Sequence, residues 1–125
     1  MSEEPDILHI DSDDHFLEIY KDFFKEKGLD SRTYSNGKRG FRAAKEYNPK
    51  VILLESVLES RDGYNLLTQL KKNGETNYIP VVLFSVLGKK KDLKKAKELG
   101  ANGYLIKQHL KPDNVLTYLK ENFIK

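Results

Sequence analysis

Five short runs with strand character recur along this chain, each followed by a longer stretch whose apolar residues have helical spacing. The runs fall at residues 7–10, 31–34, 51–54, 81–84 and 104–106. Runs that are apolar at nearly every position are typical of strands covered on both faces. Strands that alternate with helices form a parallel sheet flanked by helices, because their crossovers are right-handed. The sequence therefore predicts an α/β fold with a doubly wound, five-stranded parallel sheet, formed by residues 1–125 as a single domain.

Apolar residues at helical spacing mark the faces of the helices that should be buried. For the first helix the expected stripe is Phe16, Ile19, Tyr20 and Phe23. The fourth helix offers only Leu93, Ala96 and Leu99 to the interior. The pair Asn36-Gly37 indicates a turn. His9, within the first strand, is expected to be a hydrogen-bonded core residue rather than a ligand.

Composition excludes several classes of protein. The chain has no cysteine, which rules out disulfides, thiolate catalysis and cysteine-ligated zinc. No apolar run approaches the roughly 20 residues that a membrane-spanning helix needs. Residues 1–5 are acidic and lack the apolar stretch of a secretory signal. We therefore expect a cytoplasmic protein that does not enter the membrane.

Lysine is concentrated in the predicted fourth helix. The residues are Lys89, Lys90, Lys91, Lys94, Lys95 and Lys97, in a chain whose net charge is only +3. A nucleic-acid-binding patch and a solvated helix face both have this appearance. The segment has no interleaved aromatic residues and contains Asp92 and Glu98. The absence of aromatic residues and the presence of carboxylates favour the solvated face over nucleic-acid binding.

Polar residues follow the predicted strands, at the edge where parallel-sheet proteins of this class bind ligands. They are Asp11, Ser12, Glu55, Ser85 and Lys107. Carboxylates that face a lysine suit a divalent cation together with a phosphoryl group. A nucleotide would instead need a glycine-rich turn after the first strand, where this chain has acidic residues. Nucleotide-binding and flavin-binding alternatives are therefore excluded.

From about Ile7 to Phe123 the chain resembles a response-regulator receiver domain of two-component signalling, of the chemotaxis-regulator type. The matching segments are 7–13, 53–55, 62–64, 79–85 and 100–107. Each segment is weak evidence alone, but together they occur in the order and at the spacing of the family. The resemblance implies the (βα)5, flavodoxin-like fold with strand order 2-1-3-4-5.

The resemblance also implies roles for individual residues. Glu55 occupies the phosphoacceptor position, Ser85 and Lys107 the positions that contact the phosphoryl oxygens, and Tyr104 the position of the switch aromatic. The metal-site positions are Asp11, Ser12, Glu55 and Val57. Asp13 is expected to cap the first helix instead of binding metal.

Two of these positions depart from the family pattern, and the chain also differs from it at Gln108 and in the loop after the third strand. Ser12 replaces a carboxylate that would bind Mg²⁺ directly, so the Mg²⁺ site should be weak or absent. Glu55 replaces aspartate, and its longer side chain should carry the carboxylate toward Lys107 and Ser85, where a phosphoryl group would lie. Gln108 stands where the family has proline, and the loop segment that includes Leu58, Glu59 and Ser60 also differs.

We therefore expect an atypical, non-enzymatic receiver of the phosphorelay, biased toward the active-like arrangement with Tyr104 at least partly inward. It should be a monomer or weak dimer and contact a histidine kinase or output partner through helix four, strand five and helix five. A receiver phosphorylated inefficiently on Glu55 and a small basic nucleic-acid-binding protein remain alternatives. A purely structural ion pair between Glu55 and Lys107 also remains open.

Overall fold

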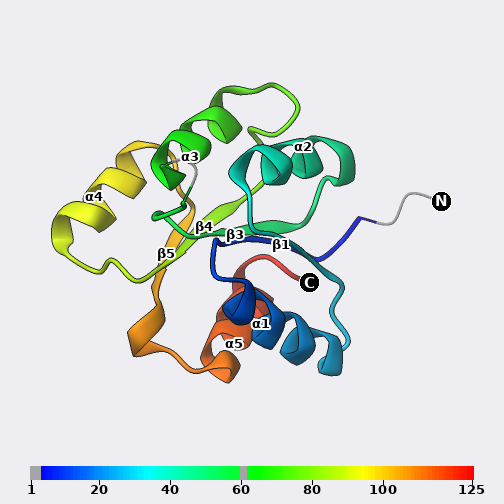
Figure 1. Ribbon diagram of the computed structural model, residues 1–125. Helices are drawn as coiled ribbons and strands as arrows, with labels where there is room; N and C mark the ends of the chain where they lie inside the picture. Colours follow the sequence, from blue (N-terminus) through cyan, green and yellow to red (C-terminus); the bar gives the residue numbers. More distant parts are fainter. Residues whose placement is uncertain (1–3, 60–61) are drawn as a thin grey trace.

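The computed structural model describes residues 4–59 and 62–125 of the chain (Figure 1). All five strands pair in parallel in one sheet with the order β2-β1-β3-β4-β5. The strands are β1 (Ile7–Ile10), β2 (Ser31–Tyr34), β3 (Val51–Leu54), β4 (Val81–Ser85) and β5 (Gly103–Ile106). This topology confirms the predicted fold class and strand order. Residues 1–3 of the acidic N-terminal segment and Ser60 lie outside the described residues.

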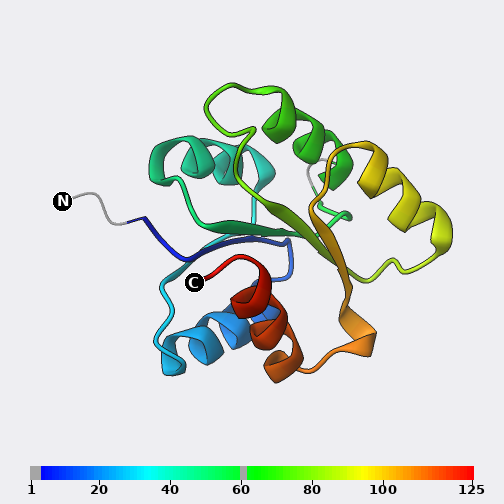
Figure 2. The ribbon, with the colours of Figure 1, turned by 180° about the vertical axis from the view of Figure 1, so that it is seen from behind.

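Five α-helices cover the two faces of the sheet. They are α1 (Asp14–Glu26), α2 (Gly37–Tyr47), α3 (Gly63–Lys72), α4 (Lys90–Glu98) and α5 (Pro112–Asn122), and a short 3₁₀ helix, η1 (Lys107–His109), follows β5. Figures 1 and 2 show α1 and α5 on one face, with α2, α3 and α4 on the other. No helix in the described part of the chain is long and apolar enough to span a bilayer.

Strands β1, β3, β4 and β5 each contribute to two separate hydrophobic cores. In β1, Leu8 and Ile10 point into the core under α2 and α3, whereas Ile7 points into the core under α1 and α5. Successive residues of a strand face opposite sides of the sheet. Because both sides are covered, nearly every position is apolar, and this accounts for the pattern of the sequence.

The buried stripe of α1 differs from the expected one. Leu17, Tyr20 and Phe24 are buried, whereas Ile19 is 48% exposed, and Phe16 and Phe23 are only partly buried. Both stripes have the spacing of a helix face, and they differ only by a small rotation about the helix axis. Tyr20, which belongs to both stripes, packs against Phe84 of β4 with ring centroids 5.2 Å apart, and burial of Phe24 in the core under α1 and α5 distinguishes the observed stripe.

Asn36 lies at the bend between β2 and α2, in agreement with its turn signal, and it also caps α2, because its side-chain oxygen accepts hydrogen bonds from the N–H groups of Lys38 and Arg39. The expected buried face of α4 is corrected. In α4, Ala96 is buried, but Leu93 is 38% exposed. Leu93 borders a cavity between α4 and β5, so no packed neighbour covers it.

His9 is buried without a hydrogen bond, contrary to expectation. Within the described residues, neither of its ring nitrogens has a partner. The ring lies among Phe16, Tyr20 and Phe84, whose centroids are 6.0 to 6.1 Å away. Burial, reinforced by the positive charge of Lys107, lowers the pKa of His9 to about 3. The imidazole is therefore neutral in the folded protein at any pH near neutrality.

We expect His9 to make the protein less stable in mild acid. The pKa of His9 is about 3 when folded and 6.5 when unfolded, so the unfolded chain binds the extra proton between these values. The contribution of neutral His9 to the free energy of unfolding is complete above pH 6.5. It is lost toward pH 3, at about 1.4 kcal/mol per pH unit. Denaturant unfolding of wild type and His9→Leu between pH 7 and pH 4.5 measures this slope.

The exposed His15 provides the control, and His15→Leu should keep the wild-type slope. Equal slopes for wild type and His9→Leu would contradict the assignment to His9.

Candidate functional site

A buried ion triad lies at the carboxyl edge of the sheet. Asp11 follows β1, Glu55 follows β3, and Lys107 begins η1 directly after β5. The Lys107 Nζ atom lies 2.5 Å from Oδ2 of Asp11 and 3.0 Å from Oε1 of Glu55. The three side chains are only 12%, 3% and 4% exposed for Lys107, Asp11 and Glu55 respectively. These three residues therefore lie together as the sequence predicts, with the lysine between the two carboxylates.

The Glu55 carboxylate has donors on both oxygens. Oε1, besides its contact with Lys107, accepts a hydrogen bond from the N–H of Val86 at 3.1 Å. Oε2 accepts from the N–H of Val57 at 3.1 Å and from the hydroxyl of Ser56 at 3.3 Å. These donors come from three different segments of the chain. A buried charge is stable when it is paired and hydrogen-bonded in this way.

The hydroxyl of Ser85 reaches Glu55 only indirectly. Its oxygen lies 2.6 Å from the Ser56 hydroxyl oxygen and accepts the N–H of Leu87 at 3.1 Å. Ser56, which contacts both Glu55 and Ser85, was not among the residues selected from the sequence. Its place directly after Glu55, at the end of a buried strand, is the signal that could have identified it.

Asp11 is held on both carboxylate oxygens. Oδ1 accepts the N–H of Asp13 at 2.9 Å, and Oδ2 pairs with Lys107. Burial raises the pKa of Asp11, while Lys107 and the N–H of Asp13 act in the opposite direction. Asp13 itself caps α1, since its Oδ1 accepts the N–H of Phe16 at 3.1 Å. The expected capping role of Asp13 is confirmed.

The residues present fit a divalent cation poorly. The Ser12 hydroxyl accepts the N–H of Glu59 at 2.8 Å, and the carboxylates of Asp11 and Glu55 share the ammonium of Lys107. Within the described ranges, no group of three or more acidic or histidine side chains is positioned to hold a metal. Mg²⁺ favours carboxylate oxygens in octahedral geometry, and at these positions it would compete with an internal cation. Val57 contributes only its backbone at this site.

The two residues after β4 are anchored by four polar groups. Val86 donates its N–H to Glu55, and its carbonyl accepts from Nε2 of Gln108 at 3.0 Å. Leu87 donates its N–H to Ser85, and its carbonyl accepts from the hydroxyl of Tyr104 at 2.8 Å. The Tyr104 ring is partly buried against the core under α2, α3 and α4. Residues 86–87 thus connect Glu55 to Tyr104.

Gly63 allows the loop after β3 to fold back close to Glu55. Asp62 caps α3 and accepts the N–H of Tyr64 at 2.9 Å, while the N–H of Gly63 bonds the Ser56 carbonyl at 3.0 Å. A Cβ at position 63 would lie 2.3 Å from the carbonyl oxygen of Glu55, which is closer than atoms can approach. The glycine at this position therefore keeps the Glu55 backbone close to the start of α3.

Comparison with known proteins agrees with this architecture. The chain is 28% identical over 101 residues to the probable transcriptional regulator ycf29 of Pyropia yezoensis, a match that covers 81% of this chain and 46% of that protein. It thus spans less than half the length of this curated relative.

Two solved structures are similar in fold. The chemotaxis protein CheY4 of Vibrio cholerae superposes with a TM-score of 0.85 at 16% identity, covering 92% of this chain and 95% of that one. The Mn²⁺-bound form of response regulator Rcp1 has a TM-score of 0.76 at 23% identity, covering 93% of this chain and 91% of that one.

The model of the response regulator receiver domain family matches residues 7–120, which is most of the chain. The parallel sheet, the strand order, and the acidic, hydroxyl and lysine side chains at its carboxyl edge agree with that match. The chain therefore belongs to the response regulator receiver domain family and is a receiver domain of the kind found in two-component signalling.

Proposed function

We propose that this receiver rests in an active-like arrangement without phosphorylation, and that it acts through protein contacts rather than through catalysis. The observation that carries the proposal is the set of donors around the Glu55 carboxylate. Lys107 and the N–H of Val86 bind one oxygen, and the N–H of Val57 and the Ser56 hydroxyl bind the other. Glu55 thereby draws the loop after β4 toward the phosphoacceptor position.

The Glu55 carboxylate imitates a bound phosphoryl group only in part. A carboxylate has one negative charge and two acceptor oxygens, whereas a phosphoryl group has more of both. The position of Ser85 agrees with this smaller number of acceptors, because its hydroxyl bonds Ser56 and does not reach Glu55 directly. A bias of only ~1 kcal/mol between two states still shifts their populations several-fold. An incomplete mimic is therefore sufficient to favour one arrangement.

The partners we propose are a histidine kinase or an output protein, bound through the surface of α4, β5 and α5. Tyr104 of β5 supports this assignment. Its hydroxyl donates to the carbonyl of Leu87, and the adjacent Val86 donates its N–H to Glu55. The state of the Glu55 site is thereby coupled to the α4–β5 surface. Weak Mg²⁺ binding and a monomeric or weakly dimeric state complete the proposal.

Phosphodonors should leave the protein unmodified over minutes. Both oxygens of Glu55 are already bonded and the side chain is 4% exposed, so neither is free for in-line attack. Intact mass spectrometry after treatment with acetyl phosphate or phosphoramidate tests this. The double variant Ser12→Asp/Glu55→Asp, which restores the family pattern, should gain an adduct. A stoichiometric wild-type adduct that hydroxylamine removes would instead favour the alternative of a phosphorylatable receiver.

Mg²⁺ should bind more tightly once a carboxylate is supplied at position 12. Titration calorimetry should show affinity higher by about tenfold or more in Ser12→Asp, because Mg²⁺ gains a charged oxygen ligand. Ser12→Asn is the matched control, since asparagine has the same shape without the charge, and it should behave like wild type. Equal affinities for wild type and Ser12→Asp would contradict the proposed cause of weak binding.

Replacement of Glu55 by Gln should loosen the loop after β4. Glutamine keeps the shape, but it has one acceptor oxygen and no charge for Lys107. Amide exchange at Val86, whose N–H donates to Glu55, should accelerate by about tenfold or more, because a hydrogen bond to a charged group contributes ~1.5–3 kcal/mol. NMR shifts across residues 85–104 should move with it.

The exposed Glu59 allows the same substitution as a control, and Glu59→Gln should leave exchange at residues 86–87 unchanged. If Glu55→Gln also leaves these signals unchanged, Glu55 is only a structural residue and the mimicry interpretation is wrong.

A further inference from the structure

The positive charge of the protein is concentrated on α4. Residues 89–98 contain six lysines and two carboxylates, a net +4, whereas the whole chain carries only +3. All six lysine side chains are exposed. In the part of the chain that the structure describes, none of them has a carboxylate within ion-pair distance. The Lys95 ammonium lies 4.5 Å from the centre of the Tyr64 ring, and the charge of the other five lysines is available to a partner.

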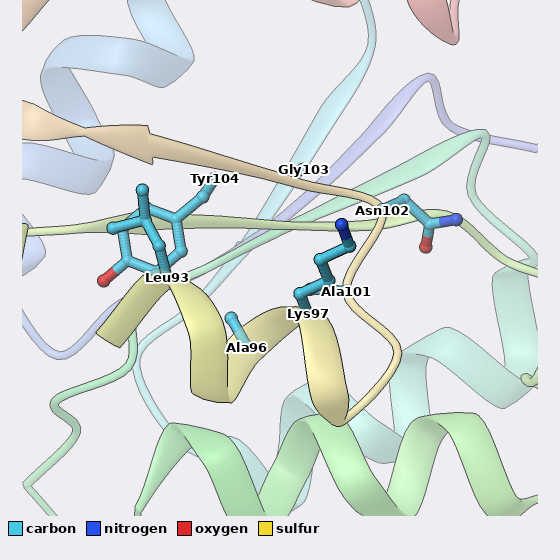
Figure 3. A pocket seen from close by; sticks show the side chains of 7 residues that line it. All are labelled: Leu93, Ala96, Lys97, Ala101, Asn102, Gly103 and Tyr104. Carbon is cyan, nitrogen blue, oxygen red and sulfur yellow. The ribbon is translucent and has the colours of Figure 1, made fainter. Parts of the chain in front are cut away.

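A mostly apolar cavity lies beside these lysines. It has a volume of about 280 Å³ and is lined by Leu93, Ala96 and Lys97 of α4 and by residues 101–104, a set that we call the α4–β5 groove. Figure 3 shows Leu93, Ala96 and Lys97 facing Tyr104 and the start of β5 across the cavity. Pockets for drug-sized ligands usually span roughly 300–1,000 Å³. The groove is therefore suited to a single anchoring side chain.

We propose that the α4–β5 groove binds an acidic protein segment that inserts one apolar side chain into the cavity. The inference rests on the proposed function, because it specifies the chemistry of the partner at the surface of α4 and β5. Acidic side chains would pair with the surrounding lysines, and the apolar anchor would cover the exposed part of Leu93. Binding surfaces commonly combine a buried apolar anchor with a charged rim in this way.

Nucleic acid would complement the lysines of this surface but not its apolar cavity. Phosphates would pair with the lysines, but a sugar-phosphate backbone has no apolar side chain to fill the cavity. Single-stranded bases would need an exposed aromatic face for stacking. Tyr104, the aromatic residue of the groove, is partly buried against the core, and its hydroxyl is bonded to Leu87. The observations therefore favour a protein segment.

The test uses fluorescence anisotropy with labelled 16-residue peptides that are rich in Asp and Glu and carry one central Leu, Phe or Met. At least one should bind the wild-type protein at micromolar to sub-millimolar concentration. Its counterpart with Ser at the central position should bind at least tenfold more weakly. A 16-base-pair DNA duplex of equal label should bind more weakly than the best peptide at physiological salt.

Substitutions on α4 test whether the peptide binds at the α4–β5 groove. Lys94→Glu/Lys97→Glu should weaken peptide binding about tenfold or more, whereas Lys21→Glu/Lys25→Glu on α1, with the same change in net charge, should have little effect. Leu93→Ser should weaken binding of the peptide with an apolar centre but not of the peptide with Ser. NMR shifts on peptide addition should map to residues 93–104.

Three results would overturn the inference: no binding by any of the peptides up to 1 mM, equal binding by the peptides with Ser and with an apolar centre, or preferred binding of DNA. Comparison with Glu55→Gln separates this inference from the proposed function. If the best peptide binds wild type and Glu55→Gln equally, the groove remains a docking site, and the coupling of that site to Glu55 is what fails.

Discussion

The ammonium group of Lys107 between the buried carboxylates of Asp11 and Glu55 is the interaction on which the carboxyl edge of this protein depends. Three charged side chains are removed from water there, and each needs partners to offset its loss of hydration. Lys107 supplies one contact to each carboxylate, and backbone N–H groups together with the Ser56 hydroxyl supply the others. The loops that follow β3 and β4 therefore fold toward the site, because their N–H groups are needed as donors.

The donors that Glu55 needs connect the site to the surface of α4 and β5. Val86 is held by Glu55 from one side and by Gln108 from the other, and the adjacent Leu87 accepts the hydroxyl of Tyr104. Hydrogen bonds thus link Glu55, through two consecutive peptide units, to the hydroxyl of Tyr104 on β5. Gln108 makes a contact here that proline, the family's residue at this position, could not make, because proline has no side-chain donor.

The site and the α4–β5 groove have opposite character. At the site, every carboxylate oxygen of Asp11 and Glu55 has a partner within the protein. On α4, only Ala96 is buried, Leu93 is partly exposed, and the lysines have no carboxylate among the described residues within ion-pair distance. The exposed lysines of α4 are thus placed to meet another molecule, in keeping with the proposed contact with a protein partner.

The α/β class, the parallel sheet and the residues at its carboxyl edge follow from local sequence patterns, because strands buried on both faces must be apolar throughout and parallel strands end at one edge. These patterns also located Asp11, Glu55, Ser85 and Lys107. Which face of α1 is buried depends on packing across the sheet, since two stripes of equal helical spacing compete until Phe24 enters the core under α1 and α5. The folded structure alone revealed that His9 has no hydrogen bond and that Ser56 stands between Glu55 and Ser85. Such contacts depend on side chains from distant segments, and no local pattern encodes their distances.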